Sequence, residues 1–299
     1  MKNPLPLPLS SRQQLTFVLL LGFSLGDVRG DLITNLTPVA DTALRNGISA
    51  DTGFGTTLAL PVGVSSSGTT INHALFKFPI HFIPANATVT QVTLQLTSVA
   101  GNPFSQGAAN FSTFRLLKDW NETDTTWNTR LAPSVGWATP GAQAGVDYVN
   151  SASASALITP GPSVNFFSSA GLLADVALWR AASSTNFGWI LIANNELAGS
   201  GKQIASREDL LQTPVLSISY TLPASPAAPV ILAPAVINTT FQFSFNAIAD
   251  HAHTVEFASS LSPTNWITLT NIAALPTDTL IHITNTASAN ERYFRVSVQ

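Results

Sequence analysis

The sequence lacks cysteine and has few charged residues. Its 299 residues include no cysteine, and charged side chains make up 10% of the chain. The absence of cysteine excludes disulfide bonds, thiolate metal sites and a cysteine nucleophile. Soluble globular domains carry roughly 25% charged residues, so a surface made mainly of Thr, Ser, Asn and Ala is more typical of an extracellular β-protein.

Basic residues are scarce as well, and they never gather in a run. The chain has 13 basic and 16 acidic side chains, which gives a net charge of −3 at pH 7. Contact with phosphate backbones needs clustered Lys and Arg, so nucleic acid is not an expected partner. The hydrophobic content of 45% is nevertheless sufficient for buried cores. Without cross-links, stability has to come from packing.

Residues 1–30 have the pattern of a secretory signal peptide. Lys2 and Arg12 supply positive charge, and residues 15–26 form an apolar stretch followed by small residues. This stretch is shorter than the ~20 residues that a membrane-spanning helix needs, which favours cleavage over an uncleaved anchor. No other segment has the length and apolar character to cross a membrane. We therefore expect a secreted protein with no membrane partner after cleavage.

Residues 31–222 alternate short β-type runs with Gly, Asn, Ser and Pro. Such runs lie at residues 73–80, 91–98, 111–117, 188–194 and 214–221. The first two have hydrophobic residues at every second position, which predicts half-buried strands. Residues 171–184 differ, because Leu172, Val176 and Trp179 have the spacing of a short helix. Many short strands with frequent turns predict an all-β, jelly-roll-like β-sandwich.

A second domain is predicted at the C-terminal end. Residues 223–235 are rich in Pro and Ala, which is typical of an extended linker. In residues 236–299 the alternation returns, with Phe241, Phe243 and Phe245 on one face of a predicted strand. We expect a second, smaller β-sandwich of a size that can fold independently.

Motifs for catalysis, metal binding and phosphate binding are not found. The serines of residues 63–70 lack the G-x-S-x-G spacing, and the glycines of residues 47–55 lack the lysine of a phosphate-binding loop, so they are interpreted as turn glycines. His251 and His253 are interpreted as a solvated strand face, because no second pair of ligands accompanies them. Paired carboxylates, as in glycoside hydrolases, remain an alternative. The chain is predicted not to be an enzyme.

Several segments, taken in order, resemble the DNRLRE-type domain, which is also classed as carbohydrate-binding module family 96. These segments are residues 41–60, 74–96, 119–128, 188–193 and 206–220. The resemblance covers most of the predicted mature chain. It implies a secreted, non-catalytic jelly-roll module whose partner is a polysaccharide. One departure is Phe78-Pro79-Ile80, where members commonly carry Phe-Asp-Leu. Residues 236–299 resemble a small fibronectin-type-III-like module.

The matched motifs contain four polar candidates for carbohydrate binding: Arg45, Lys77, Arg207 and Glu208. Arg suits bidentate recognition of carboxylates, which an acidic, uronate-type polysaccharide would supply. An internal ion-pair network is an equally open interpretation of the same residues. Asp side chains and backbone oxygens in loops would suit a structural calcium ion, although the sequence contains no defined calcium loop. No other cofactor is expected.

Residues 119–130, DWNETDTTWNTR, form the densest polar cluster of the chain. They would suit a catalytic carboxylate pair, a sugar-stacking platform or a structural turn. The resemblance rests on the spacing of Trp120, Glu122, Trp127 and Asn128. We therefore predict that the two tryptophans pack at the edge of the sandwich, while Glu122 and Asn128 hold the turn.

Two functions follow from these patterns. The first is a secreted, non-catalytic protein that binds polysaccharide, with acidic polysaccharide as the expected class. The alternative is a structural or adhesive protein of the cell surface or matrix that uses the same β-sandwich without specific glycan binding.

Overall fold

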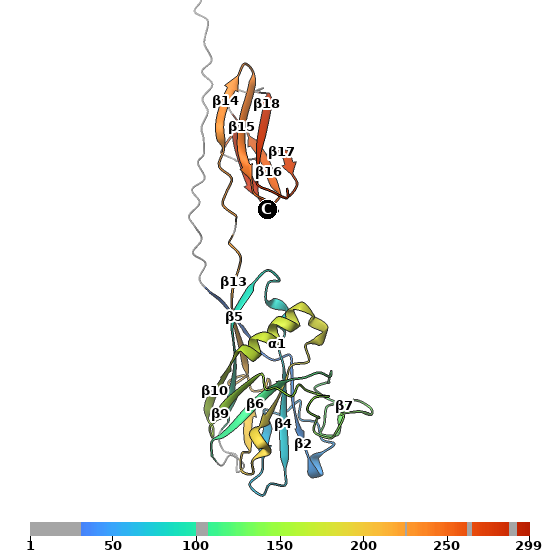
Figure 1. Cartoon of the computed structure of the whole chain (residues 1–299). Coiled ribbons are helices and arrows are strands. Elements are labelled where there is room, and N and C mark those ends of the chain that lie inside the picture. Colours follow the sequence, from blue (N-terminus) through green and yellow to red (C-terminus); the bar gives the residue numbers. More distant parts are fainter. Residues whose placement is uncertain (1–30, 100–106, 225, 262–264, 287–291) are drawn as a thin grey trace, which may run out of the picture. The chain divides into compact units, whose positions relative to one another are not determined.

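The computed structural model describes residues 31–99, 107–224, 226–261, 265–286 and 292–299. It divides the chain into two compact units, one that extends to Pro223 and one that begins at Ala224 (Figure 1). The predicted signal peptide, residues 1–30, lies outside the described residues. Within those residues, no helix has both the length and the apolar character needed to cross a bilayer.

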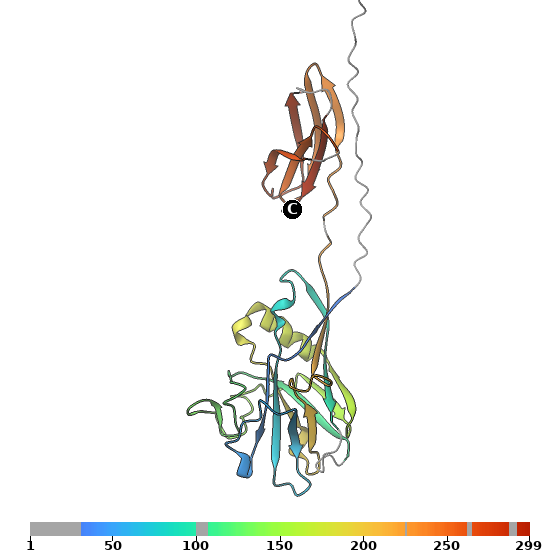
Figure 2. The same cartoon turned by 180° about the vertical axis from the view of Figure 1, so that it is seen from behind.

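The first unit is a β-sandwich of two antiparallel sheets. One sheet contains β1 (Leu32–Leu36), β5 (Thr88–Ser98), β10 (Ser163–Ser168), β12 (Lys202–Ala205) and β13 (Val215–Thr221). The other contains β2 (Ala40–Arg45), β4 (Ile71–Lys77), β6 (Ala109–Arg115), β9 (Ala154–Ile158) and β11 (Trp189–Ala193). Strand β3 (Ala59–Val64) pairs with both β12 and β4, so it joins the two sheets. The predicted sandwich is thereby confirmed (Figures 1 and 2).

Side chains from both sheets meet in the main core. Leu94 and Leu96 of β5, Phe76 of β4 and Phe167 of β10 are fully buried there. Strand β5 alternates buried and more exposed positions through residues 92–96, as predicted for a half-buried strand. Four short 3-10 helices complete the unit: η1 (Gly47–Ser49), η2 (Ile80–Phe82), η3 (Ser183–Thr185) and η4 (Asn194–Glu196).

A third layer covers the outer face of the second sheet. It is built by residues 116–150, which include the hairpin of β7 (Thr129–Leu131) and β8 (Val135–Gly136). Leu116, Trp120 and Trp137 from this layer pack against side chains of the sheet, among them Leu44, Leu75, Ile190 and Ile192. The central residues of β4 are consequently buried on both faces. The prediction of a half-buried strand at residues 73–80 is therefore wrong, since a long-range contact covers the face expected to meet solvent.

The predicted helix is confirmed as α1 (Ala170–Ala181). It begins after Ser169, whose Oγ accepts a hydrogen bond from the backbone N–H of Leu172 at 3.2 Å. Leu172, Val176 and Trp179 are buried in the main core, as their spacing requires. Trp179 packs edge-on against Trp189 of β11, with 4.6 Å between ring centroids.

The second unit is a small β-sandwich of two antiparallel three-stranded sheets. One sheet is β14 (Leu232–Ile237), β15 (Thr240–Ala247) and β18 (Thr279–Thr286), and the other is β17 (Ile267–Ile272), β16 (His253–Ala258) and β19 (Tyr293–Val298). Phe241, Phe243 and Phe245 are buried between them. Strand β14 begins inside residues 223–235, the segment predicted as a linker. His253 is buried against Phe245, so its interpretation as solvated is wrong.

The turn before β11 gives a direct test of this packing. Gly188 has φ +81°, and a Cβ there would lie 2.0 Å from the carbonyl oxygen of Phe76 on the neighbouring strand. Gly199 also has φ +81°, but a Cβ there would meet nothing within 4 Å. We expect Gly199→Ala to lower the free energy of unfolding by about 1 kcal/mol, because of backbone strain. Gly188→Ala should cost on the order of 3 kcal/mol or more, because strand β4 has to move as well.

Denaturant unfolding followed by tryptophan fluorescence measures the free energy of unfolding of both variants, because the first unit holds five of the six tryptophans. Equal losses of stability in the two variants would contradict the close approach of residue 188 to β4.

Candidate functional site

A cluster of carboxylates surrounds Arg207 in the first unit. The Nη1 of Arg207 donates hydrogen bonds to both carboxylate oxygens of Glu122, at 3.1 and 2.8 Å, and to the carbonyl oxygen of Val39. The backbone N–H of Arg207 donates to Oδ2 of Asp41 at 2.7 Å. The backbone N–H of Asp41 donates to Glu122 at 2.8 Å, and Nε of Arg207 lies 3.6 Å from Oε1 of Glu208. We call Asp41, Glu122, Arg207 and Glu208 the Arg207 cluster.

Glycines allow a neighbouring loop to close over Glu122. A Cβ at Gly55 would lie 2.2 Å from the carbonyl oxygen of Glu122, and one at Gly53 would lie 3.1 Å from that of Thr123. The approach at Gly55 requires a residue without a side chain, whereas the contact at Gly53 is only tight. These glycines belong to the segment interpreted as turn glycines, and their packing role agrees with that interpretation.

Burial dominates the electrostatics of the cluster. The side chain of Asp41 is 0% exposed, and this burial raises its pKa from 3.8 to about 7. The hydrogen bond from the backbone of Arg207 opposes the rise, while the charges of Glu208 and Glu122 add to it. Oδ1 of Asp41 and Oε2 of Glu208 are buried and accept no hydrogen bond within the described part of the chain. Two oxygens of the cluster therefore lack a partner from the protein.

The structure does not bring the four predicted carbohydrate-binding residues into one site. Arg207 and Glu208 lie in the cluster. Lys77, at the end of β4, pairs in register with Ala40 of β2. Arg45 is at the far end of β2 from Asp41, a separation of four residues or about 13 Å along a strand. For Arg207 and Glu208 the geometry supports the internal-network interpretation.

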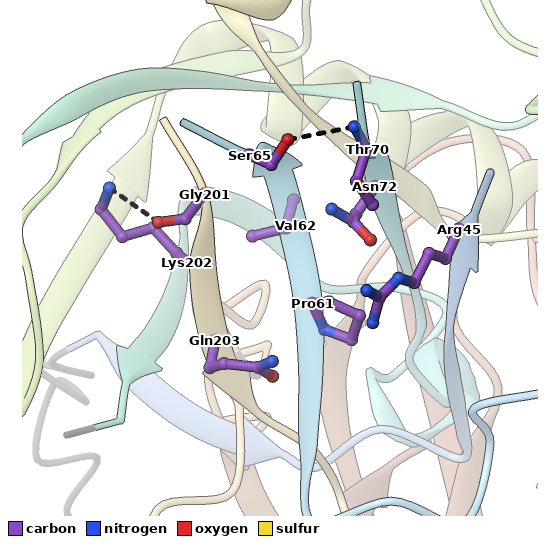
Figure 3. Close-up of a pocket in the computed structure, with 9 residues that line it drawn as sticks. All are labelled: Arg45, Pro61, Val62, Ser65, Thr70, Asn72, Gly201, Lys202 and Gln203. Atoms are coloured by element: carbon purple, nitrogen blue, oxygen red, sulfur yellow. Dashed lines mark hydrogen bonds between the residues drawn. The ribbon is translucent and has the colours of Figure 1, made fainter. Parts of the chain in front are cut away.

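Arg45 lines a different feature, a small open pocket with a cavity volume of about 20 Å³. The pocket is lined by Arg45, Pro61, Val62, Ser65, Thr70, Asn72, Gly201, Lys202 and Gln203 (Figure 3). Figure 3 shows the guanidinium of Arg45 and the amide of Gln203 on either side of Pro61. We call this feature the Arg45 pocket. Pro61, Asn72 and Gln203 were not predicted as site residues, because single residues within strands carry no motif.

Two polar side chains of the Arg45 pocket differ in their bonding. Nδ2 of Asn72 donates to the carbonyl oxygen of Gly63 at 3.0 Å, whereas its Oδ1 is buried without a hydrogen bond from the described residues. Nζ of Lys202 donates to the carbonyl oxygens of Ser200 and Gly201. Burial lowers the pKa of Lys202, whose side chain points away from Arg45 (Figure 3). Arg45 and Lys202 therefore point in different directions, and Pro61 lies between Arg45 and Gln203 (Figure 3).

The tryptophans of residues 119–130 have packing roles. Trp120 is buried and its Nε1 donates to the carbonyl oxygen of Phe187 at 2.8 Å, while the half-buried Trp127 lies 5.3 Å from the ring of His73. Both pack over the outer face of the second sheet. Nδ2 of Asn128 donates to Asp51 at 2.7 Å, which fastens the turn to the neighbouring loop. The two tryptophans pack as predicted, but over the outer face of the second sheet rather than at the edge of the sandwich. Four of the six tryptophans are buried, and Trp127 and Trp266 are half-buried.

Substitution of Glu122 tests the role of the Arg207 cluster. Glu122→Gln keeps the shape of the side chain but removes the charge that pairs with Arg207. Because the pair is partly exposed, we expect a loss of about 1–2 kcal/mol in the free energy of unfolding. Asp124→Asn is the matched control, since Asp124 accepts only a local hydrogen bond from Thr123. Glycan affinity reduced at an unchanged melting temperature would contradict a stabilising role for Glu122.

The comparisons with known proteins concern the first unit. Residues 33–150, less than half of the chain, match the family model of carbohydrate-binding module family 96. No curated protein matches the chain. The matched range includes Asp41, Arg45, Asn72 and Glu122, and it ends before β9. The first β-sandwich is thus similar to carbohydrate-binding module family 96, and this similarity indicates a carbohydrate-binding role.

Proposed function

We propose that the first β-sandwich is a non-catalytic module that binds an acidic, uronate-type polysaccharide at the Arg45 pocket. The observation that carries the proposal is that the side chain of Arg45 lines a small open pocket, within the range similar to carbohydrate-binding modules. A guanidinium pairs bidentately with a carboxylate, the group that distinguishes uronates from neutral sugars.

The remaining polar groups of the pocket suit sugar hydroxyls. The amide of Gln203 offers both donors and an acceptor opposite Arg45 (Figure 3). Oδ1 of Asn72 lacks a hydrogen bond from the described residues and would accept one from a hydroxyl. A cavity volume of about 20 Å³ has room for about one water-sized group. The pocket would therefore receive a single group of the polymer, such as one carboxylate oxygen of a uronate unit, while the sugar rings lie over the surface.

The proposal includes no catalytic step. Glu122 is engaged by Arg207 and by the backbone of Asp41, which supports a structural rather than an acid–base role. Secretion follows from the surface composition and from the signal pattern of residues 1–30. In the second unit, two packed three-stranded sheets are compatible with a small fibronectin-type-III-like module.

The alternative is a structural or adhesive protein that does not bind glycans specifically. It is favoured by one observation: Arg207 and Glu208, two of the four predicted binding residues, face partners within the protein. In that case the Arg45 pocket would have no ligand, and the β-sandwiches would act as spacers.

Affinity gel electrophoresis with alginate, pectin, chondroitin and a neutral glucan distinguishes these functions. We expect retention by a uronate-containing polymer, and a loss of about tenfold in affinity for Arg45→Gln, because one charge-assisted bidentate contact is removed. Arg295→Gln is the control, since it changes the net charge equally but lies in the second unit, where it pairs with Glu256. Equal retention of the wild type and Arg45→Gln would exclude the pocket, and retention on none of the polymers would favour the structural alternative.

A further inference from the structure

We propose that the Arg207 cluster binds one calcium ion through the carboxylates of Asp41, Glu122 and Glu208. The ion would connect strand β2, the layer of residues 116–150 and the segment that follows β12. This site is separate from the Arg45 pocket and does not depend on glycan binding.

The spacing of the carboxylates suits a calcium ion. One oxygen from each of Asp41, Glu122 and Glu208 lies within 4.8 Å of the others. Calcium binds oxygen at 2.3–2.6 Å, so two oxygens on opposite sides of one ion are about 5 Å apart. A single ion placed between the three side chains would therefore be within reach of one oxygen from each of them.

Unpartnered oxygens give the second, independent indication. Asp41 is completely buried, and its Oδ1 accepts no hydrogen bond within the described residues. Oε2 of Glu208 is also buried and accepts no hydrogen bond within the described residues. A buried carboxylate oxygen without a partner is costly, and proteins normally satisfy it with a donor or with a metal ion. The donors of Arg207 are directed at Glu122, at Val39 and at the other oxygen of Asp41.

The charge of the cluster favours a divalent ion. Three carboxylates face the one guanidinium of Arg207, which leaves two excess negative charges when all three are ionised. A calcium ion would neutralise them and relieve the repulsion among the acids. Calcium accepts six to eight oxygen ligands in irregular geometry, with carboxylates in bidentate contact, whereas magnesium demands a regular octahedron. Zinc is disfavoured because no His or Cys belongs to the cluster.

Calcium binding by the full chain tests the site directly. The protein is treated with EDTA, dialysed against metal-free buffer at pH 8 and titrated with calcium chloride. We expect isothermal titration calorimetry to show one calcium per chain. The melting temperature of the first unit should rise by about 5 °C or more when free calcium is ~100 times its Kd. Neither heat nor a shift in melting temperature at millimolar calcium would overturn the proposal.

Substitution of the proposed ligands tests where the ion binds. Glu208→Gln and Asp41→Asn should each abolish the calcium-dependent rise in melting temperature, and Glu208→Gln decides the question if Asp41→Asn does not fold. Glu256→Gln, which removes a carboxylate from the second unit, should keep the full rise. A rise retained in both cluster variants would put the ion elsewhere and overturn the assignment. All measurements are made without polysaccharide, so their outcome is independent of the proposed glycan binding.

Discussion

The ion pair between Arg207 and Glu122 holds together the three layers of the first β-sandwich. Arg207 follows β12, a strand of the first sheet, while Glu122 belongs to the layer that covers the second sheet. Asp41 of β2 bonds to both residues and brings in the second sheet itself. The bonds between these residues satisfy polar atoms that would otherwise lack hydrogen-bond partners. The position of each layer is therefore coupled to that of the other two.

The first unit can be stable with few charged residues because most of its stability comes from packing. The outer layer packs two tryptophans, Trp120 and Trp137, on the second sheet, which converts a solvent-facing surface into a second core. Burial of that surface supplies stability without cross-links. The polar cluster then favours the meeting of these segments, because the buried Asp41 is hydrogen-bonded to both Glu122 and Arg207.

Strand β2 contributes to both the Arg207 cluster and the Arg45 pocket. Asp41 near its beginning belongs to the Arg207 cluster, whereas Arg45 at its end lines the pocket. The range similar to the carbohydrate-binding family stops at residue 150, yet β13 lies between β1 and β5 in the first sheet. Residues 33–150 therefore cannot complete the sandwich, since that edge of the sheet requires strands from the later part of the domain.

Local pattern in the sequence determined the all-β class, the helix α1 and the burial of Phe241, Phe243 and Phe245, because periodicity depends only on neighbouring residues. It also indicated that Trp120 and Trp127 pack. The tertiary structure decided what distant contacts control: β4 is buried on both faces, and His253 is buried against Phe245. Asp41 meets Arg207 across 166 positions of sequence, while Arg45 and Glu208, joined in the predicted site, lie apart. No local pattern encodes such pairings, since they arise only when the sheets close.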